Sequence, residues 1–300
     1  MARLVQCIPN FSEGRRQDVV AKIVDAIAST STARVVDYSS DSDHNRCVVT
    51  FIGSPEDVRA SILAGARAAV ELIDMNAHTG AHPRIGAVDV VPVVPVVEMT
   101  MADAVGLSYE IGRDIAEHLH VPVYFYERSA IASHRANLAA VRKGGYEEIK
   151  RRGLTDGREP DLGPGEPHPT AGATVVGARG PLIAYNVNLA GSDVGIAREI
   201  AARIRRLRDS GQAFPGVKAI GVYLKSRGIA QVSTNITQPH QVSMYDVYAF
   251  VEREAMAMGD SVLESELIGA IREDALIEAV TSAVKLRSLD SRRVLDHWIR

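Results

Sequence analysis

The amino-acid sequence predicts a mixed α/β protein that is built of two similar halves. The first observation is its length, because 300 residues exceed what one hydrophobic core usually holds and suit two cores. The second is that the hydrophobic periodicity predicts the same order of strands and helices, β-α-β-β-α-β, twice along the chain. Hydrophobic residues make up 46% of the chain and charged residues 24%, which is the balance of an ordinary folded protein.

The first half is predicted from short apolar runs and from one clear helix start. Ser54 in the capping position, Pro55 in the first turn and Glu56 near the positive end of the helix dipole predict a helix that begins here. The predicted elements are a strand at 4–8, a helix at 17–29, strands at 33–38 and 46–53, a helix from 54 to about 75 and a strand at 87–97.

The second half repeats this order of elements without repeating the residues. Its predicted elements are a strand at 181–188, a helix at 193–209, strands at 217–225 and 228–235, a helix at 242–259 and a strand at 261–269. This order is that of the ferredoxin-like split βαβ motif. The prediction is therefore two ferredoxin-like βαββαβ subdomains, 1–179 and 180–300, packed side by side with a ligand cleft between them.

Additional elements are predicted outside the two repeats. Helices are predicted at 101–119 and 130–143, with a strand at 121–126 between them. Residues 157–172 are rich in Pro, Gly and acidic residues, which predicts an ordered loop joining the halves or a disordered linker. The pattern returns to helix after residue 271.

Composition argues against several classes of function. A formal net charge of -3 and an aromatic content of 5% do not suit a nucleic-acid-binding face. Cys7 and Cys47 lie in predicted strands, so we expect two buried, reduced thiols and a reducing compartment. Residues 1–9 lack the features of a signal peptide, and no apolar run reaches the ~20 residues that span a bilayer. We therefore expect a cytoplasmic protein.

The densest group of reactive side chains lies at 76–89, in a Gly-containing loop between a predicted helix and strand. It contains His78, His82, Arg84 and Asp89. Histidine can donate and accept a proton near neutral pH, and arginine suits a carboxylate. Two alternatives stay open. The spacing of the two histidines is that of a helical zinc site, although Gly80 and Pro83 disfavour a helix, and both histidines fit a purely structural role.

A second group, at 9–14, leaves a strand and enters a helix. Ser12 is expected to cap that helix, and its free N–H groups suit an anion or a carbonyl oxygen. A simple capping turn is the alternative. The glycine patterns of dinucleotide-binding and phosphate-binding loops are absent from the sequence.

Two further polar groups are candidates for a binding site. One is the loop with Asp37, Asp41, Asp43, His44, Asn45 and Arg46, which fits either a carboxylate that orients a histidine or a solvated turn. The other is formed by Gln231, Ser233 and Asn235, which share one face of a predicted strand and fit a polar cleft or a solvent-facing sheet. No serine nucleophile motif is present, so covalent catalysis has no support.

Several motifs in series resemble the glutamate formimidoyltransferase (formiminotransferase) family. They cover most of the chain in order. The segments that carry the resemblance are Cys7–Gly14, Asn45-Arg46, Leu72–Met75, His82–Asp89, Pro122–Tyr124, Gly172–Val175, Gly177–Arg179, Asn186–Asn188 and Gln231–Asn235. The chain departs from the family pattern at Ala171, where an aromatic residue is usual, and at Ser39, where an acid is usual.

The resemblance implies a fold of two α/β subdomains and the catalytic residue His82. It also implies that tetrahydrofolate, a co-substrate, is contacted by the loop at 163–172, and that no metal is needed. The residues of that loop are Gly163, Pro164, Gly165, Glu166, Pro167, His168, Pro169, Thr170, Ala171 and Gly172. Further candidates for substrate binding are Asn10, Ser12, Arg46, Arg84, Asn186, Gln231 and Asn235.

The implied reaction transfers the formimino group of N-formimino-L-glutamate to N5 of tetrahydrofolate, in histidine degradation and one-carbon metabolism. The resemblance covers the transferase portion, so we expect a transferase without the cyclodeaminase domain of the animal enzyme. Two alternatives are formyl transfer between 5-formyltetrahydrofolate and glutamate, and a folate-binding protein with little catalysis; a metal hydrolase is more remote. The expected partners are small molecules and, by family precedent, a second copy in a homodimer, with no nucleic acid or membrane.

Overall fold

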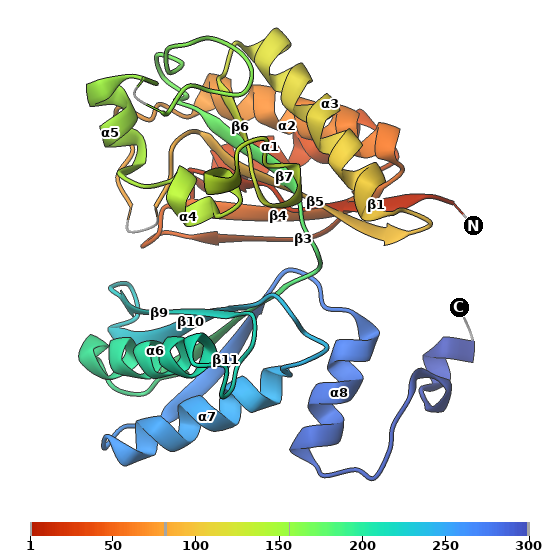
Figure 1. The fold of residues 1–300 in the computed structure, drawn as a ribbon, viewed down its shortest axis with the longest axis vertical. Helices are drawn as coiled ribbons and strands as arrows, with labels where there is room; N and C mark the ends of the chain where they lie inside the picture. The colour runs from red at the N-terminus through yellow and green to blue at the C-terminus, as the bar shows by residue number, and fades with distance from the viewer. Residues whose placement is uncertain (1, 81–82, 156, 299–300) are drawn as a thin grey trace. The chain divides into compact units, whose positions relative to one another are not determined.

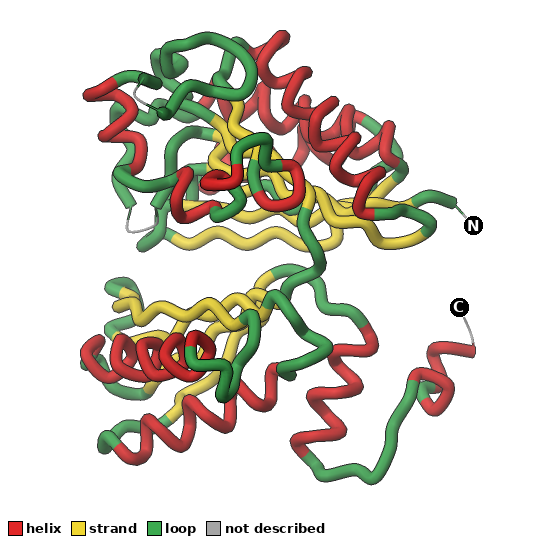
Figure 2. Tube along the Cα trace, viewed as in Figure 1, coloured by secondary structure: helices red, strands yellow, loops and turns green. Residues whose placement is uncertain are grey.

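The computed structural model describes residues 2–80, 83–155 and 157–298. The chain divides into two compact units, Met1–Gly180 and Pro181–Arg300. Each unit contains a β-sheet with helices and its own hydrophobic core (Figures 1 and 2). The mixed α/β class predicted from the sequence is confirmed.

The first unit is a mixed sheet with helices packed on it. Its elements in chain order are β1 (Leu4–Cys7), β2 (Asn10–Phe11), α1 (Gln17–Thr30), β3 (Arg34–Asp41), β4 (Arg46–Gly53), α2 (Pro55–Leu72), β5 (Val88–Val97), α3 (Met101–Leu119), β6 (Val123–Phe125), the 3-10 turns η1 (Glu127–Ser129) and η2 (Ser133–Arg135), α4 (Leu138–Val141), α5 (Gly145–Arg152) and β7 (Thr174–Ala178).

The sheet of the first unit is a ferredoxin-like sheet with two added strands. β1 and β2 both pair with β4 on one side and with β5 on the other, so they act as one interrupted strand. The antiparallel part therefore runs β3, β4, β1/β2, β5. β7 then pairs with β5, and β6 with β7, both in parallel. Parallel strands of one sheet need a crossover connection, and α3 lies in the connection from β5 to β6.

Alternation along the strands determines which face of this sheet is the core. Cys7, Phe11, Cys47 and Phe51 are fully buried, and they occupy paired positions on neighbouring strands. Phe11 lies beside Gly65 of α2, so these side chains share the face that the helices cover. The two cysteines are buried free thiols, as predicted, and burial raises the pKa of Cys47 to about 12.

The second unit has, within its described residues, the same ferredoxin-like motif, with four strands and no added ones. Its elements are β8 (Ile183–Leu189), α6 (Val194–Asp209), β9 (Val217–Leu224), β10 (Ile229–Ile236), α7 (Met244–Ala257) and β11 (Val262–Ile268), followed by α8 (Glu273–Ala283) and the 3-10 turns η3 (Ser291–Arg293) and η4 (Leu295–Trp298). The strand order is β11-β8-β10-β9, antiparallel throughout. The βαββαβ order predicted for this half is confirmed.

The predicted helix at 130–143 is wrong. The chain there forms η2 and the four-residue α4, because tertiary contacts override the helical propensity. Arg135 is 10% exposed at its side chain and forms an ion pair of 2.6 Å with Asp161. Ser129 Oγ accepts a hydrogen bond from the backbone N–H of Ala178, at 2.9 Å.

The Pro/Gly-rich run at 157–172 does not join the two units, because β7 follows it within the first unit. It is held to the first unit by backbone hydrogen bonds, among them Val123 N to Leu162 O at 3.0 Å and Met75 N to Thr170 O at 2.7 Å. The sequence patterns also missed β2, α5 and β7. In the described part of the chain no helix is long and apolar enough to cross a membrane.

Two glycines of α3 give a matched test of the packing between this helix and the sheet. A Cβ atom at Gly112 would lie 2.7 Å from the ring of Phe125, whereas one at Gly106 would meet nothing within 4 Å. We expect Gly106→Ala to stabilise the protein by about 0.5–1 kcal/mol through helix propensity. We expect Gly112→Ala to destabilise it by about 1–3 kcal/mol, because the ring of Phe125 is buried. Urea unfolding followed by circular dichroism measures both, and equal effects would contradict this packing.

Candidate active site

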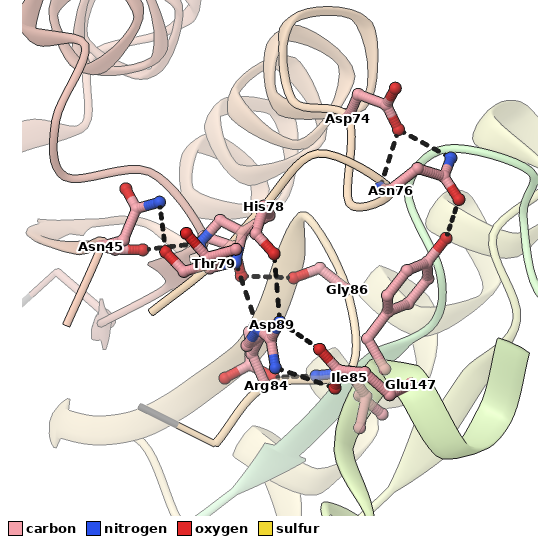
Figure 3. A network of polar contacts seen from close by, with 12 residues as sticks. Asn45, Asp74, Asn76, His78, Thr79, Arg84, Ile85, Gly86, Asp89 and Glu147 are labelled. Atoms are coloured by element: carbon pink, nitrogen blue, oxygen red, sulfur yellow. Dashed lines mark hydrogen bonds and ion pairs between the residues drawn. The ribbon is translucent and has the colours of Figure 1, made fainter. Parts of the chain in front are cut away.

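Three of the predicted motifs meet around residues 83–89 of the first unit (Figure 3). Ser12 holds this segment from one side, since its Oγ donates to Gly86 O at 2.7 Å and its backbone N–H to Ala87 O at 2.9 Å. Ala171 holds it from the other side, because its carbonyl accepts the N–H of Ala87 at 2.8 Å. The strand-to-helix motif, the histidine-containing loop and the Pro/Gly-rich loop are therefore contiguous.

His82, the expected catalytic residue, lies outside the described residues, together with Ala81. The chain is anchored on both sides of them. Before them, Thr79 O accepts a hydrogen bond from Asn45 Nδ2 at 2.9 Å. After them, the carbonyl of Arg84 accepts the N–H of Tyr146 at 2.8 Å, and the intervening Pro83 is exposed.

The imidazole of His78 is held by hydrogen bonds at both of its ring nitrogens. Its Nδ1 accepts a hydrogen bond from Arg84 Nε at 3.1 Å, so the ring proton is on Nε2, which lies 2.9 Å from the carbonyl of Asn45 (Figure 3). Burial lowers the pKa of His78, which favours this neutral form. Both ring nitrogens are engaged, which disfavours His78 as a zinc ligand. Among the residues with described positions, no three His, Cys, Asp or Glu side chains gather as a metal site.

Arg84 is engaged by a carboxylate of the protein. Its Nη1 and Nη2 donate to the two oxygens of Glu147 at 3.0 and 2.6 Å, and its Nη2 also reaches His78 O at 3.3 Å. The Arg84 side chain is 11% exposed and that of Glu147 64%. Although burial acts to raise it, the pKa of Glu147 is lowered by the hydrogen bonds from Arg84.

The predicted capping role of Ser12 is wrong, because its hydroxyl donates to Gly86 instead. Within the described parts of the chain no side chain caps α1, and Glu13 closes the turn just before it, since its Oε1 accepts the N–H groups of Arg15 and Arg16, each at 2.9 Å. Arg16 also pairs with the second carboxylate oxygen at 2.5 Å. Burial acts to raise the pKa of Glu13, but these hydrogen bonds lower it below its usual value.

The polar loop between β3 and β4 is connected to the strand-to-helix motif by a hydrogen bond between Asn45 and Gly14. Gly14 N donates to Asn45 Oδ1 at 3.0 Å, and a Cβ atom at Gly14 would lie 2.2 Å from Asp41 O. Asp41 Oδ1 accepts the N–H of His44 at 2.8 Å, as in a turn. Arg46, at the start of β4, is half-buried. Burial lowers its pKa, and the positive charge of Arg142 lowers it further.

The loop at 163–172 has an exposed first half and an anchored second half. Gly163, Pro164, Gly165 and Glu166 are exposed, whereas Ala171 is buried. His168 Nδ1 accepts the N–H of Ala171 at 3.0 Å and that of Thr170 at 3.3 Å, which closes the turn. Burial lowers the pKa of His168, so this acceptor nitrogen is favoured.

A second chain of hydrogen bonds joins this loop to α5. Asn76 Nδ2 donates to Pro169 O at 3.0 Å, and Asn76 Oδ1 accepts from Tyr146 Oη at 2.9 Å and from Lys150 Nζ at 2.5 Å. Asp74 Oδ1 in turn accepts from Asn76 Nδ2 at 2.7 Å (Figure 3). Sequence reasoning missed Tyr146, Glu147 and Lys150, which no sequence motif marks.

The remaining candidates for substrate binding lie on β2 of the first unit and on the sheet of the second unit. Asn10 of β2 donates through Nδ2 to Ile8 O at 3.1 Å. In the second unit, Gln231 is buried and donates to Asn188 Oδ1 at 2.8 Å. Asn186 Nδ2 donates to Glu266 Oε2 at 3.3 Å, and Asn235 is exposed. The register places Gln231, Ser233 and Asn235 opposite Asn188, Asn186 and Ala184 of β8.

Substitution of Glu13 tests whether this carboxylate stabilises the site. We expect Glu13→Gln to destabilise the protein at pH 7 by about 1–3 kcal/mol, because the amide replaces a charged acceptor. Since the folded-state pKa is lowered, the contribution of the carboxylate is present above its unfolded pKa of about 4.3 and is lost as pH falls through the lower folded value. Urea unfolding at pH 7 and at pH 3 checks this. A difference between the two proteins that does not shrink at acid pH would contradict it.

Comparison with known proteins identifies the family. The formiminotransferase domain, N-terminal subdomain, matches residues 4–179, and the formiminotransferase domain matches residues 184–290. The glutamate formimidoyltransferase of Thermoplasma acidophilum is 40% identical over 295 residues, which are 98% of this chain and 96% of that protein. That of Streptococcus pyogenes serotype M1 is 40% identical over 300 residues, 100% and 99% of the two chains. The formimidoyltransferase-cyclodeaminase of Sus scrofa is 41% identical over 286 residues, which are 93% of this chain and 52% of that protein. The chain therefore belongs to the formiminotransferase family.

Proposed function

We propose that this protein transfers the formimino group of N-formimino-L-glutamate to N5 of tetrahydrofolate, giving 5-formiminotetrahydrofolate and L-glutamate. The observation that carries the proposal is the 40% identity, over nearly the whole length of each chain, with two glutamate formimidoyltransferases. Both halves of the chain also match models of formiminotransferase domains.

In the proposed reaction the N5 amine attacks the formimino carbon and forms the new C–N bond. The proton leaves N5 for His82, and His82 then gives a proton to the glutamate nitrogen. That nitrogen departs as an amine when its bond to the formimino carbon breaks. A positioned acid–base group contributes about 100- to 10,000-fold to the rate. Holding two substrates together lowers the barrier further, because it removes the entropy cost of their encounter.

Tetrahydrofolate is assigned to the loop at 163–172 as part of this proposal. The exposed half of the loop offers backbone groups to a ligand, and the anchored half fixes it beside the segment that follows His82. Asn10, Ser12, Asn186, Gln231 and Asn235 are proposed to bind amide groups of either substrate. Asn10 and Ser12 lie beside residues 86–90, whereas the other three belong to the second unit.

The central test of the mechanism is His82→Ala. We expect turnover to fall by at least ~100-fold while folate affinity is retained, because the imidazole acts on the reacting nitrogens and not as an anchor. Release of L-glutamate from formiminoglutamate measures turnover, and calorimetry with 5-formyltetrahydrofolate measures folate binding. Turnover near that of the wild type would show that His82 is not the acid–base group.

The identity of the one-carbon donor is tested by parallel assays. We expect formimino transfer from formiminoglutamate to tetrahydrofolate to exceed formyl transfer between 5-formyltetrahydrofolate and glutamate. The reverse order would favour the formyl alternative, and folate binding without either reaction would indicate a binding protein. Metal analysis of the active protein addresses the hydrolase alternative.

The homodimer and the cytoplasmic location remain proposals from the family, and sedimentation velocity tests the first.

A further inference from the structure

The loop at 78–84, which contains His82, has its two ends joined by one side chain. Arg84 Nε donates to His78 Nδ1 at 3.1 Å, and Arg84 Nη2 donates to the carbonyl of His78 at 3.3 Å. Both contacts connect the residue at which the loop begins with the residue at which it ends (Figure 3). The side chain of Arg84 therefore limits how far the two ends of the loop can separate.

Arg84 is itself fixed by α5. Its Nη1 and Nη2 donate to the two oxygens of Glu147 at 3.0 and 2.6 Å, and its carbonyl accepts the N–H of Tyr146 at 2.8 Å. Two consecutive residues of this helix thus bind the side chain and the backbone of Arg84, and a bidentate pair also fixes the plane of the guanidinium. A substrate carboxylate would have to displace Glu147 from Arg84. These contacts favour a role for Arg84 in holding the loop over the expected role in binding a carboxylate.

The other end of the loop is fixed by the residue that precedes β4. His78 Nε2 lies 2.9 Å from the carbonyl of Asn45, and Asn45 Nδ2 donates to the carbonyl of Thr79 at 2.9 Å. The imidazole of His78 therefore connects Asn45 on one side with Arg84 on the other.

The neutral imidazole with its proton on Nε2 is the form that satisfies both contacts of His78. Arg84 Nε always carries a hydrogen, so Nδ1 must accept, and the carbonyl of Asn45 requires a donor at Nε2. An imidazolium would instead turn a second N–H group toward Arg84. Burial lowers the pKa of His78, which favours the neutral form. The proposed reaction does not otherwise use this half-buried, titratable side chain.

We propose that His78 and Arg84 are positioning residues for His82, because the hydrogen bond between them holds the backbone on both sides of that residue. The inference rests on the proposed function for the acid–base role of His82. Neither side chain acts on the reacting atoms. Since a displacement of about 1 Å at a reacting group can cost about 100-fold in rate, contacts that fix this backbone should affect turnover more than binding.

Two substitutions of His78 separate the roles of its two ring nitrogens. In His78→Asn the amide oxygen takes the place of Nδ1, so the hydrogen bond from Arg84 is kept. In His78→Gln the longer side chain places an amide N–H near the position of Nε2, so the acceptor for Arg84 is lost. We expect kcat to stay within about threefold of the wild type in His78→Asn and to fall about 10- to 100-fold in His78→Gln. The KM of each substrate should change less than about twofold in both variants.

Nuclear magnetic resonance measures the placement of His82 without turnover. The imidazole resonances of His82, identified by their loss in His82→Ala, should keep their wild-type chemical shifts in His78→Asn and move in His78→Gln. Both variants remove the aromatic ring at position 78, so the loss of its ring current is matched. Long-range proton–nitrogen correlation spectra of the wild type should show the proton of His78 on Nε2.

A matched control for general loss of stability is Arg59→Gln, which removes an arginine that pairs with the nearly buried Asp114 between α2 and α3. It should not lower kcat selectively. Equal kcat values in the two His78 variants, equal displacement of the His82 resonances, or a His78 proton on Nδ1 would each overturn the proposal. A wild-type protein without transfer activity would refute the proposed function, and the His82 resonances would still decide whether His78 positions that residue.

Discussion

The close approach of backbones at Gly86 is the constraint on which the rest of the site depends. A Cβ atom at this position would lie 2.1 Å from Ala173 O and 2.5 Å from Ala171 O, so only glycine allows the two segments to meet. Ser12 approaches the same residue from β2 and binds its carbonyl. Two loops that are far apart in the sequence are thereby fixed to one strand end.

Electrostatic interactions and hydrogen bonds then determine which charged side chains of the candidate site already have partners within the protein. The carboxylates of Glu13 and Asp89 are buried, and each accepts hydrogen bonds from backbone N–H groups of the site. Glu147 neutralises Arg84, and the hydrogen bond from Arg84 keeps the proton of His78 on Nε2.

Sequence patterns predicted the repeated core well and the inserted region poorly. The helix at 17–29 and the strands at 46–53 and 87–97 agree with the structure to within a residue or two, the helix because its burial follows the helical period and the strands because they are long apolar runs rich in β-branched residues. β7 was missed because it is short and buried on both faces, which leaves no alternation. α5 is mostly charged and buries only Tyr146 and Ile149, so it has no apolar stripe to recognise. The contacts of Glu147 and Arg142 depend on tertiary structure and leave no mark on spacing.

The two units share one motif, but several of the groups that hold residues 83–89 come from an insertion in the first. The second unit has β8 to β11 and two helices in the βαββαβ order, followed by a helical tail. The first unit adds the segment between α3 and β7, which supplies Arg142, Tyr146, Glu147 and the loop at 163–172. The sheet provides β5, whose pairing with β2 is irregular at Asp89, and the insertion provides Arg142, which pairs with Asp89. The contacts at residues 83–89 therefore depend on the insertion as well as on the shared motif, which also explains why the βαββαβ pattern alone predicted the architecture but did not locate the candidate site.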